Sequence, residues 1–372
     1  MKLAFCLYKY FPYGGMQRNF LAIARECLAR GHQVRVYVLE WQGAPPEELE
    51  IVHVPAGALR NIRRYRQYSA WVAEHLAEHP VDRVVGFNKM PGLDVYYAAD
   101  PCYAEKAITQ RGKWYRFGAR YRHFMDYEKA VFGPQSDTVL MLLSQPEREI
   151  FDRHYQLDPD RVRMLPPGIS ADRRAPGNAS EIRRAFRQQQ GVADDELILL
   201  QIGSDFVRKG VDRTLRAMAA LPVSLRERTR LLVVGEADAA PMEKLALGLG
   251  LDQQVRFVGG REDILPFLLG ADLFMHPAYH ENTGNVILEA MVAGLPPLVS
   301  GICGYAHHVI DADAGWVVAE PFSQTALNQV LARILGDHDL RAAWSVNALA
   351  YAEHADLYSR PARAAEVILG EG

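Results

Sequence analysis

The sequence has little cysteine and no cysteine motif. Four cysteines are present in 372 residues, none forms a C-x-x-C pair, and no histidine stands at zinc-finger spacing from them. This scarcity excludes a disulfide-stabilised scaffold and a zinc site of the finger type. We expect small, buried cysteine side chains in a reducing cytosol, at Cys6, Cys27, Cys102 and Cys303.

Long apolar runs are also lacking. No stretch approaches the roughly 20 apolar residues that a membrane-spanning helix requires. In the amino-terminal segment MKLAFCLYKYFPYGG, a short apolar run is followed at once by Tyr8, Lys9 and Tyr10, which indicates a buried first strand rather than a signal peptide. The sequence therefore predicts a cytoplasmic chain that does not cross a bilayer, and it leaves open whether the chain lies on one.

Neither sign of charge is in large excess. The formal net charge is −3 at pH 7, so no global positive field marks a nucleic-acid-binding protein. We expect no nucleic acid partner. Repeats at solenoid spacing and low-complexity tracts are absent as well, which excludes a repeat array.

Apolar strand-like runs alternate with helical patterns in both halves of the chain. The length fits two domains of about 150 to 200 residues. Strands without polar alternation, separated by helices, indicate parallel sheets covered on both faces, so we predict an α/β fold with two Rossmann-like domains. The predicted strands are residues 3–8, 34–38, 51–54, 83–87, 138–142, 197–202, 231–234, 255–258, 273–276 and 297–299, and the predicted helices include 16–30, 211–220 and 284–293.

A hinge is predicted at the segment LPPGI, residues 165–169, because two prolines and a glycine follow a short strand-like run. We place an N-terminal acceptor domain at residues 1–167 and a C-terminal nucleotide-binding domain at residues 168–354. The tail, residues 355–372, has helical character, and we expect it to cross back onto the first domain.

Two loops at the ends of predicted strands carry groups suited to phosphate. Gly14 and Gly15 follow the first strand and precede a helix, where the backbone can approach an anion and free N–H groups can bind it. They form no G-x-G-x-x-G sequence, so a firmly held dinucleotide is disfavoured. In the second half, Arg208 and Lys209 stand between a buried strand and a helix, which suits a diphosphate.

The segment HENTGNVILE, residues 280–289, is the most specific pattern. It follows a buried strand and opens a helix near Gly284, so the backbone amides of residues 282–285 are expected to point toward a ligand. Glu281 lies on the loop before them, where a carboxylate can bind sugar hydroxyls. Glu289 lies in the helix, where a carboxylate can accept both hydroxyls of a ribose.

The spacing of these two glutamates resembles that of the retaining glycosyltransferases with the GT-B fold, in which Glu, seven residues and Glu stand at the head of a helix in the second Rossmann-like domain. Collinear segments over nearly the whole chain further resemble the lipopolysaccharide core glycosyltransferases, family 4-like enzymes that add the first outer-core hexose to the inner-core heptose. These segments are AFCLYKYFPYGGMQRNF, VVGFNKMPGLDVYYAADPCYAEK, LPPGI, GSDFVRKGVDR and CGYAH.

The resemblance implies a UDP-sugar donor, UDP-glucose for these relatives, bound mostly by the second domain. It implies that Arg208 and Lys209, helped by Arg173, neutralise the leaving diphosphate. Across the cleft, Lys89, Asp94 or Asp100 would meet the acceptor, with Asp100 joining Glu281, Lys209 and Arg208 as a catalytic candidate. The further donor contacts that it implies are Gly14 and Gly15 at the phosphates, Arg261 at the uracil, Glu281, Asn282, Thr283, Gly284 and Asn285 at the hexose, and Glu289 at the ribose.

No metal or cofactor is expected for this chemistry, because fixed cations and amides can stabilise the negative charge that builds on the leaving diphosphate. Two D-x-D sequences, at residues 158–160 and 311–313, lie in turn-like contexts apart from the predicted diphosphate site. Retention fits attack on the same face as the leaving group, with a departing phosphate oxygen helping to deprotonate the acceptor hydroxyl.

Residues 103–132 combine an excess of basic residues with interleaved aromatic residues. Such a composition predicts an interfacial helix on an anionic leaflet, at about 1 kcal/mol per basic residue near the surface. We expect peripheral binding to the cytoplasmic face of the inner membrane, where a lipopolysaccharide acceptor is anchored. The basic residues assigned to acceptor or membrane are Arg63, Arg64, Lys113, Arg116, Arg120 and Arg122.

Three alternatives stay open. Asn282, Thr283 and Asn285 are polar where glucose-transferring relatives have small apolar residues, so a UDP-N-acetylgalactosamine donor for the same acceptor is one. Another GT-B enzyme, such as a nucleotide-sugar epimerase or a phosphorylase, is the second. A non-catalytic module that binds a membrane surface is the third, and the presence of both glutamates with Arg208 and Lys209 argues against it.

Overall fold

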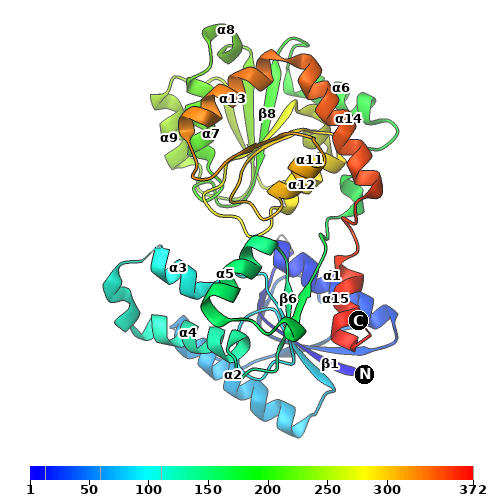
Figure 1. Cartoon of the computed structure of the whole chain (residues 1–372). Helices are drawn as coiled ribbons and strands as arrows, with labels where there is room; N and C mark the ends of the chain where they lie inside the picture. Colours follow the sequence, from blue (N-terminus) through cyan, green and yellow to red (C-terminus); the bar gives the residue numbers. More distant parts are fainter. Residues whose placement is uncertain (13, 59, 110, 372) are drawn as a thin grey trace. The chain divides into compact units, whose positions relative to one another are not determined.

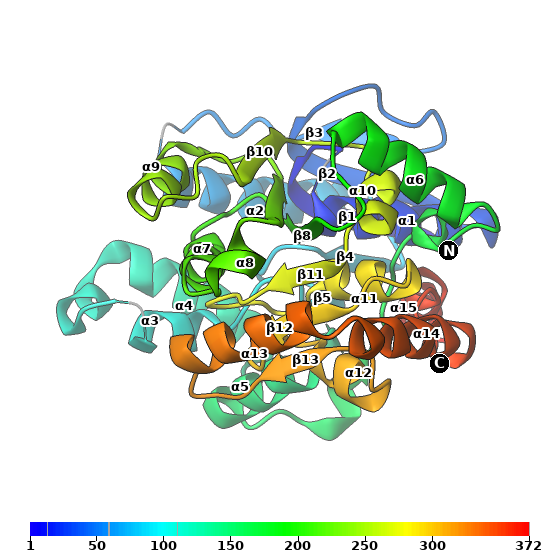
Figure 2. The ribbon, with the colours of Figure 1, turned by 90° about the horizontal axis from the view of Figure 1, so that it is seen from above.

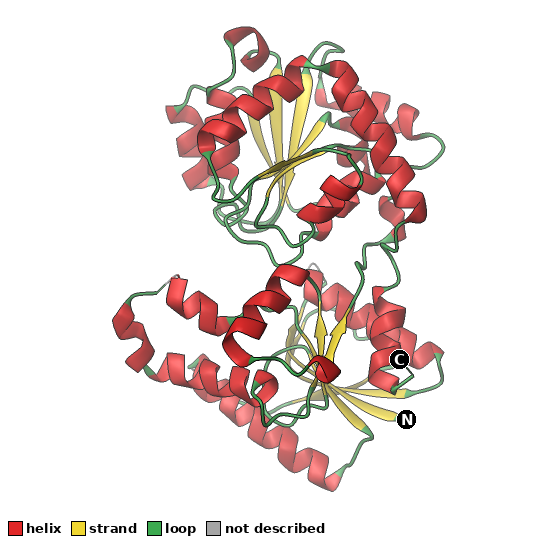
Figure 3. Cartoon of the chain, viewed as in Figure 1, coloured by secondary structure: helices red, strands yellow, loops and turns green. Residues whose placement is uncertain are grey.

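The computed structural model describes residues 1–12, 14–58, 60–109 and 111–371, apart from the side chain of residue 113. The chain divides into two compact units (Figure 1). Unit 1 consists of Met1–Gly168 together with Ser359–Gly372, and unit 2 consists of Ile169–Tyr358. Each unit is an α/β layer structure with helices on both faces of one sheet (Figure 3).

Unit 1 contains a seven-stranded parallel sheet in the order β3-β2-β1-β4-β5-β6-β7. Its strands are β1 Lys2–Tyr10, β2 Gln33–Trp41, β3 Glu50–His53, β4 Arg83–Gly86, β5 Val95–Tyr97, β6 Val139–Leu142 and β7 Val162–Met164. Its helices are α1 Gly15–Ala29, α2 Asn61–Glu78, α3 Tyr103–Thr109, η1 Lys113–Phe117, α4 Ala119–Phe132, α5 Gln145–Tyr155, η2 Pro159–Arg161 and α15 Arg360–Leu369.

Unit 2 contains a six-stranded parallel sheet in the order β10-β9-β8-β11-β12-β13. Its strands are β8 Leu197–Ile202, β9 Thr229–Val234, β10 Val255–Gly259, β11 Leu273–His276, β12 Pro297–Ser300 and β13 Trp316–Val318. Its helices are η3 Ala171–Arg173, α6 Ala179–Gln190, α7 Val211–Ala219, α8 Val223–Arg226, α9 Ala240–Gly248, α10 Leu265–Gly270, α11 Asn285–Val292, α12 Ala306–Asp311, α13 Gln324–Gly336 and α14 His338–His354.

Apolar side chains on both faces of each sheet explain the layering. In unit 2, helices α7, α9 and α13 lie on one face of the sheet and α6, α10 and α11 on the other (Figure 2), and their apolar side chains form two separate core clusters with the strands. The strands carry almost continuous apolar sequence, such as LILLQI in β8, because neither face meets water. The predicted fold class, two Rossmann-like domains of the GT-B type, is confirmed.

The last helix, α15, belongs to unit 1 although unit 2 precedes it in the sequence. It lies beside α1, and its residues Ala364, Ala365, Ile368 and Leu369 join the core between α1 and the sheet (Figure 1). Arg360 is 1% exposed and its Nε donates to the carbonyl of Pro166 at 2.9 Å, which anchors the start of the helix.

Two sequence-based expectations need correction. The segment 103–132 is not one interfacial helix, because α3, η1 and α4 are separate elements, with Gly112 and Gly118 flanking η1. The short strands β5 and β13 were not predicted, since each has only three residues and too little sequence to show a pattern, whereas β7 is the short strand expected before the hinge. All four cysteines are buried and unpaired, as expected.

Candidate active site

The predicted donor residues of unit 2 gather where the strand order of its sheet reverses. From β8 the chain proceeds to β9 and β10 on one side, and β11 then starts the other side with β12 and β13. Arg208 and Lys209 lie in the loop that follows the carboxyl end of β8, and Glu281 lies in the loop that follows the carboxyl end of β11. Open α/β sheets bind ligands outside such a switch point, so the topology brings the two loops to the expected position.

Glu281 is the centre of a cluster of basic side chains. Lys209 Nζ contacts Glu281 Oε2 directly, Arg208 Nη1 lies 3.5 Å from the same oxygen, and His276 Nε2 lies 3.3 Å from it. The side chains of Lys209 and Glu281 are each 11% exposed. The structure thus joins residues 208, 209 and 281, which are far apart in the sequence, into one charged group.

The electrostatics of this cluster keep Glu281 ionised. Burial by itself would raise the pKa of Glu281, but the hydrogen bond from His276 and the charges of Lys209 and Arg208 hold that pKa far below its usual range. Burial, together with the charge of Lys209, lowers the pKa of His276. The cluster therefore combines a carboxylate, two cations and a neutral imidazole at neutral pH.

Backbone contacts hold the two loops together. Gly210 has φ +72°, and a Cβ on it would lie 2.1 Å from the carbonyl oxygen of Pro277. Arg213 donates to that carbonyl at 3.1 Å, and the backbone N–H of Tyr279 donates to the carbonyl of Arg208 at 2.8 Å. Because these contacts join loop to loop, they set the positions of Arg208 and its neighbour relative to the segment that carries Glu281.

Helix α11 begins beside the cluster. Gly284, with φ +93°, is its N-cap, and the preceding loop is held by the backbone N–H of Tyr305, which donates to the carbonyl of Thr283 at 2.8 Å. Asn285 Oδ1 is buried and makes no hydrogen bond within the described part of the chain. Glu289 is 6% exposed and lies four residues after Asn285, so both face the same side of the helix.

The other predicted donor residues of unit 2 lie in different surroundings. Arg173 ends η3, which packs against α11, and its buried Nε has no hydrogen-bond partner among the described residues. Arg261 follows β10, is exposed, and forms a two-pronged ion pair with Asp263 at 2.8 and 2.7 Å. Their roles toward phosphate and uracil stay predictions.

In unit 1 the predicted residues also follow strands. Gly14 is the N-cap of α1, and a Cβ on it would meet the side-chain oxygen of Gln17, whereas Gly15 faces open space. Asp100 follows β5 and is exposed. Lys89 follows β4 but is turned inward, since its Nζ lies 2.5 Å from Glu128 and its side chain is only 11% exposed. The acceptor role of Lys89 stays a prediction, and Glu128 already balances the charge of this lysine.

Asp94, the third residue considered for the acceptor, lies at the opposite edge of the unit 1 sheet. It precedes β5 and accepts the backbone N–H of Val84 at 2.7 Å. Ligands bind at the carboxyl ends of parallel strands, so this position does not favour an acceptor role for Asp94, which stays a prediction.

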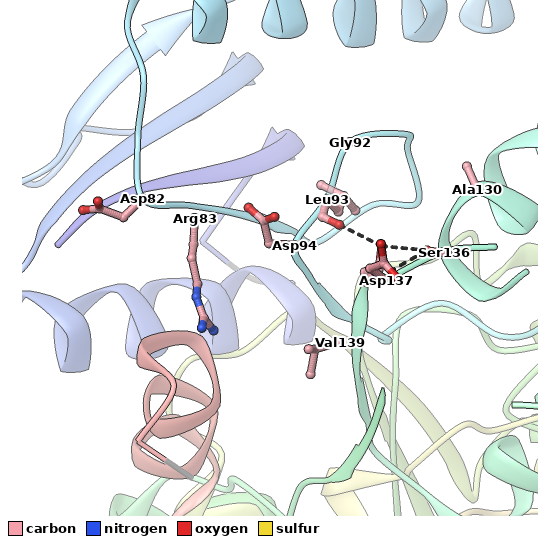
Figure 4. Close-up of a pocket in the computed structure, with 10 residues that line it drawn as sticks. Asp82, Arg83, Gly92, Leu93, Asp94, Ala130, Ser136, Asp137 and Val139 are labelled. Atoms are coloured by element: carbon pink, nitrogen blue, oxygen red, sulfur yellow. Dashed lines mark hydrogen bonds between the residues drawn. The ribbon is translucent and has the colours of Figure 1, made fainter. Parts of the chain in front are cut away.

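Asp94 lines a cavity of about 550 Å³ at the amino-terminal ends of β4, β5 and β6 (Figure 4). Asp82 in this cavity accepts the backbone N–H of Lys2 at 2.6 Å, and Arg83 donates to the carbonyl of Val367 in α15 at 3.2 Å. These polar groups fasten the sheet edge and the last helix. We assign the cavity no part in catalysis.

The predicted basic surface of unit 1 is only partly available. Arg63, Arg116, Arg120 and Arg122 are exposed, whereas Arg64 pairs with Glu40 at 2.5 Å. Lys113 has its side chain outside the described atoms. Between these residues two aromatic side chains stand out into solvent, Trp114 at 85% and Phe117 at 75% exposure.

Two residues of the site were missed from sequence. His276 is the last residue of an apolar strand, and Arg213 lies inside a helix. A polar residue at the end of a buried strand, near a switch point, is a feature from which sequence analysis can predict a site residue. His276 has this feature. Nothing in the sequence marks Arg213.

The described residues contain no cluster of three or more His, Cys, Asp or Glu side chains suited to a metal. In the first D-x-D sequence, the side chain of Asp158 accepts the backbone N–H of Asp160 at 3.0 Å and so caps the short helix η2. Among the same residues, no helix has the length and apolar character needed to cross a membrane.

Comparison with known proteins agrees with this geometry. The family model "Glycosyltransferase Family 4" matches residues 13–173, and "Glycosyl transferases group 1" matches residues 182–350. The lipopolysaccharide glucosyltransferase WaaG of Escherichia coli K12 is 50% identical over 370 residues, covering 100% of this chain and 99% of that protein. A D-inositol 3-phosphate glycosyltransferase of Streptomyces scabiei is 34% identical over 58% of this chain and 50% of its own length.

Solved structures give the same result. The crystal structure of WaaG has a TM-score of 0.93 at 50% identity and covers 99% of this chain and 100% of its own. Anabaena Alr3699/HepE in complex with UDP-glucose has a TM-score of 0.75 at 19% identity and covers both chains fully, which shows a shared fold. The chain therefore belongs to the GT-B glycosyltransferase family that includes WaaG, and it is an enzyme that transfers a sugar from a nucleotide sugar.

Proposed function

We propose that this enzyme transfers a hexose from a UDP-sugar to a heptose of the lipopolysaccharide inner core, with retention of the α configuration. Full-length identity of 50% to a lipopolysaccharide glucosyltransferase supports this assignment. The observation that carries it is the cluster of Arg208, Lys209 and Glu281 at the switch point of unit 2. UDP-glucose is the donor by that relationship.

The cluster suits departure of a diphosphate. Negative charge builds on the diphosphate as the bond to the sugar breaks, and fixed cations stabilise it without reorganisation. Lys209 and Arg208 stand at a helix-preceding loop beside the first turn of α11, so both charge and free N–H groups are at hand. Arg173 adds a third cation and Glu289 the ribose contact. The chemistry proceeds without a metal, so chelation by EDTA is expected to leave the rate unchanged.

Retention is assigned to attack on the same face as the leaving group. A departing phosphate oxygen takes the proton of the acceptor hydroxyl while the new glycosidic bond forms at the anomeric carbon. Glu281 is assigned the binding of the sugar rather than attack on it, with its Oε2 held by Lys209, Arg208 and His276. Mass spectrometry that trapped a glycosyl ester on a carboxylate would contradict this mechanism.

A specific observation favours a second donor. Asn285 Oδ1 is buried beside the predicted hexose site without a hydrogen-bond partner in the described chain. The N–H of an acetamido group can donate to that oxygen, and an unpaired buried acceptor is otherwise costly. UDP-N-acetylgalactosamine is therefore the alternative donor for the same acceptor.

Comparing kcat/KM for UDP-glucose and UDP-N-acetylgalactosamine with a heptose-terminated acceptor tests both proposals. A preference for the hexosamine that Asn285→Ala removes, while the rate with UDP-glucose stays constant, would support the alternative. A preference for glucose would support the first assignment, and turnover of neither would contradict both. Release of an epimerised nucleotide sugar without acceptor would point instead to an epimerase.

The acceptor location is proposed from the surface of η1 and its neighbours. Trp114 and Phe117 are largely exposed, and their ring centroids lie 6.0 Å apart. Arg116, Arg120 and Arg122, which are close to them in the sequence, are exposed as well. Exposed aromatic rings beside arginines suit the interface of an anionic leaflet, so we place the enzyme peripherally on the cytoplasmic face of the inner membrane.

A further inference from the structure

His276 is a buried histidine whose ring makes a hydrogen bond to the candidate site residue Glu281. It ends β11, is 0% exposed, and stacks near Phe274 with ring centroids 5.8 Å apart. Its Nε2 lies 3.3 Å from Glu281 Oε2, while its Nδ1 is buried without a hydrogen-bond partner among the described residues. Nε2 therefore makes a hydrogen bond, whereas Nδ1 makes none among the described residues.

The protonation of His276 follows from this geometry. Glu281 is ionised and can only accept hydrogen bonds, so Nε2 must carry the hydrogen and donate it. Burial disfavours a charged imidazolium, which leaves Nδ1 without a proton. A neutral donor at this point orients the carboxylate without adding a third positive charge to the two cations already present.

The contacts on Glu281 are unequal between its two oxygens. The contacts from Lys209, Arg208 and His276 all reach Oε2. Within the described chain, no hydrogen bond or ion pair reaches Oε1. Since the side chain retains 11% exposure, the carboxylate has one committed oxygen and one that is available to a ligand.

We propose that His276 is a positioning residue for glycosyl transfer: its Nε2–H fixes the rotation of the Glu281 carboxylate, so that Oε1 faces the hydroxyls of the transferred hexose. The inference rests on the proposed function, in which Glu281 binds that hexose. Lys209 and Arg208 are the cations that the proposed function assigns to the diphosphate, whereas His276 is 0% exposed and, among these groups, contacts only the carboxylate. His276 therefore holds the carboxylate while Lys209 and Arg208 act on the diphosphate.

Three substitutions separate this role from simple packing. His276→Gln places an amide N–H near the position of Nε2, His276→Asn places one near Nδ1, and His276→Phe fills the space without a donor. We expect His276→Phe and His276→Asn to lower kcat by about 10-fold or more, as loss of a hydrogen bond to a charged group implies, and His276→Gln to restore most of the rate. Affinity for UDP, which lacks the hexose, is expected to stay within about 2-fold in all three.

The outcomes distinguish this inference from the proposed function. If Glu281→Gln abolishes transfer while His276→Phe retains the wild-type kcat, the role of His276 is wrong and that of Glu281 stands. If Glu281→Gln retains the wild-type rate, the proposed function of the site fails first. An equal loss of UDP affinity and kcat in all three His276 variants would show a packing role and overturn the inference.

Discussion

At the scale of single residues, the site depends on charges that are buried together. Lys209 and Glu281 are each 11% exposed, and a buried ion pair is costly to break because it leaves the other charge unpaired. The proposed function gives a reason to retain this pair, because it assigns the same cation to the diphosphate. In that proposal, the Lys209 ammonium group pairs with Glu281 in the absence of substrate and contacts the diphosphate when substrate is bound.

Lys209→Met is the direct test of that ammonium group. We expect kcat to fall by about 100-fold or more, because one fixed donor to developing charge is worth roughly that factor. The matched control is Lys244→Met, an exposed lysine in α9 of the same unit, which should leave kcat unchanged. Steady-state kinetics measure both, and a Lys209→Met enzyme with normal kcat would remove Lys209 from the catalytic site.

At the scale of elements, the loops after β8 and β11 act as one structure because their backbones are in contact. Gly210 is the point of closest approach, since it combines φ +72° with 2.1 Å between its would-be Cβ and the carbonyl oxygen of Pro277. A side chain there has to push the two loops apart. The geometry of the cluster around Glu281 thus depends on Gly210, a residue without a functional side chain.

Gly210→Ala tests this dependence. We expect a loss of about 2 kcal/mol or more in the free energy of unfolding and a lower kcat, because backbone strain and a steric clash act together. Gly191→Ala is the control, since Gly191 has φ +63° but nothing within 4 Å of its would-be Cβ, so it reports strain alone. Equal stability loss in both variants, with kcat unaffected, would contradict the account of the loop contact.

The segment from α3 to α4 is the second element with a testable property. Replacing Trp114 and Phe117 together by Ala removes two exposed rings without disturbing the core. We expect binding to vesicles that contain anionic lipid to weaken by about 10-fold or more, because partition of aromatic side chains into the interface is lost. Val346→Ala, an exposed apolar residue on α14, is the control. Sedimentation that showed equal binding of wild type to neutral and anionic vesicles would contradict the proposed membrane contact.

At the scale of the whole molecule, the chain begins and ends in the same unit. Helix α15 completes the core of unit 1 after the chain has built unit 2, so unit 1 cannot be completed until the last residues are present. Ile368, fully buried in α15, packs in the same core as β1 and α1. Local helix formation alone does not stabilise α15, since a helix of ten residues is marginal in water.

Ile368→Ala therefore should destabilise unit 1. We expect the free energy of unfolding to fall by about 2–5 kcal/mol, as for other large-to-small substitutions in a core. Arg363→Ala, an exposed position on the same helix, should change it by less than about 0.5 kcal/mol. Urea unfolding followed by circular dichroism measures both, and similar values for the two variants would show that α15 is not part of the unit 1 core.

A histidine in each unit makes stability depend on pH: His123 in unit 1 is buried and His308 in unit 2 is half-buried. Burial lowers the pKa of His123 in unit 1 and of His308 in unit 2 to about 4. In the unfolded chain a histidine binds its proton near pH 6.5, so between about pH 6.5 and pH 4 the unfolded state binds more protons. The free energy of unfolding should accordingly fall as the pH falls through this range.

Urea unfolding at pH 7.5 and pH 5 measures the effect. His123→Phe should reduce the difference between the two pH values, because the phenyl ring has no proton to bind. A pH dependence unchanged by this substitution would show that His123 contributes nothing to it.

Sequence alone determined the fold class, most strands and the residues at the ends of β8 and β11, because apolar periodicity and the position of polar residues after strands are local properties. It also indicated a glutamate pair whose spacing resembles that of a known family. It did not reveal that Lys89 is paired inside unit 1 with Glu128, that Asp94 lies at the amino-terminal end of β5, or that α3, η1 and α4 are separate elements.

Those features were decided only by tertiary structure, because they depend on which residues distant in the sequence become neighbours. Arg208, Lys209, His276 and Glu281 became one cluster through the order of the strands, and all three contacts to Glu281 reach Oε2. Sequence determined which chemical groups are present near the strand ends. The fold determined which of them are paired and which oxygen is left for a ligand.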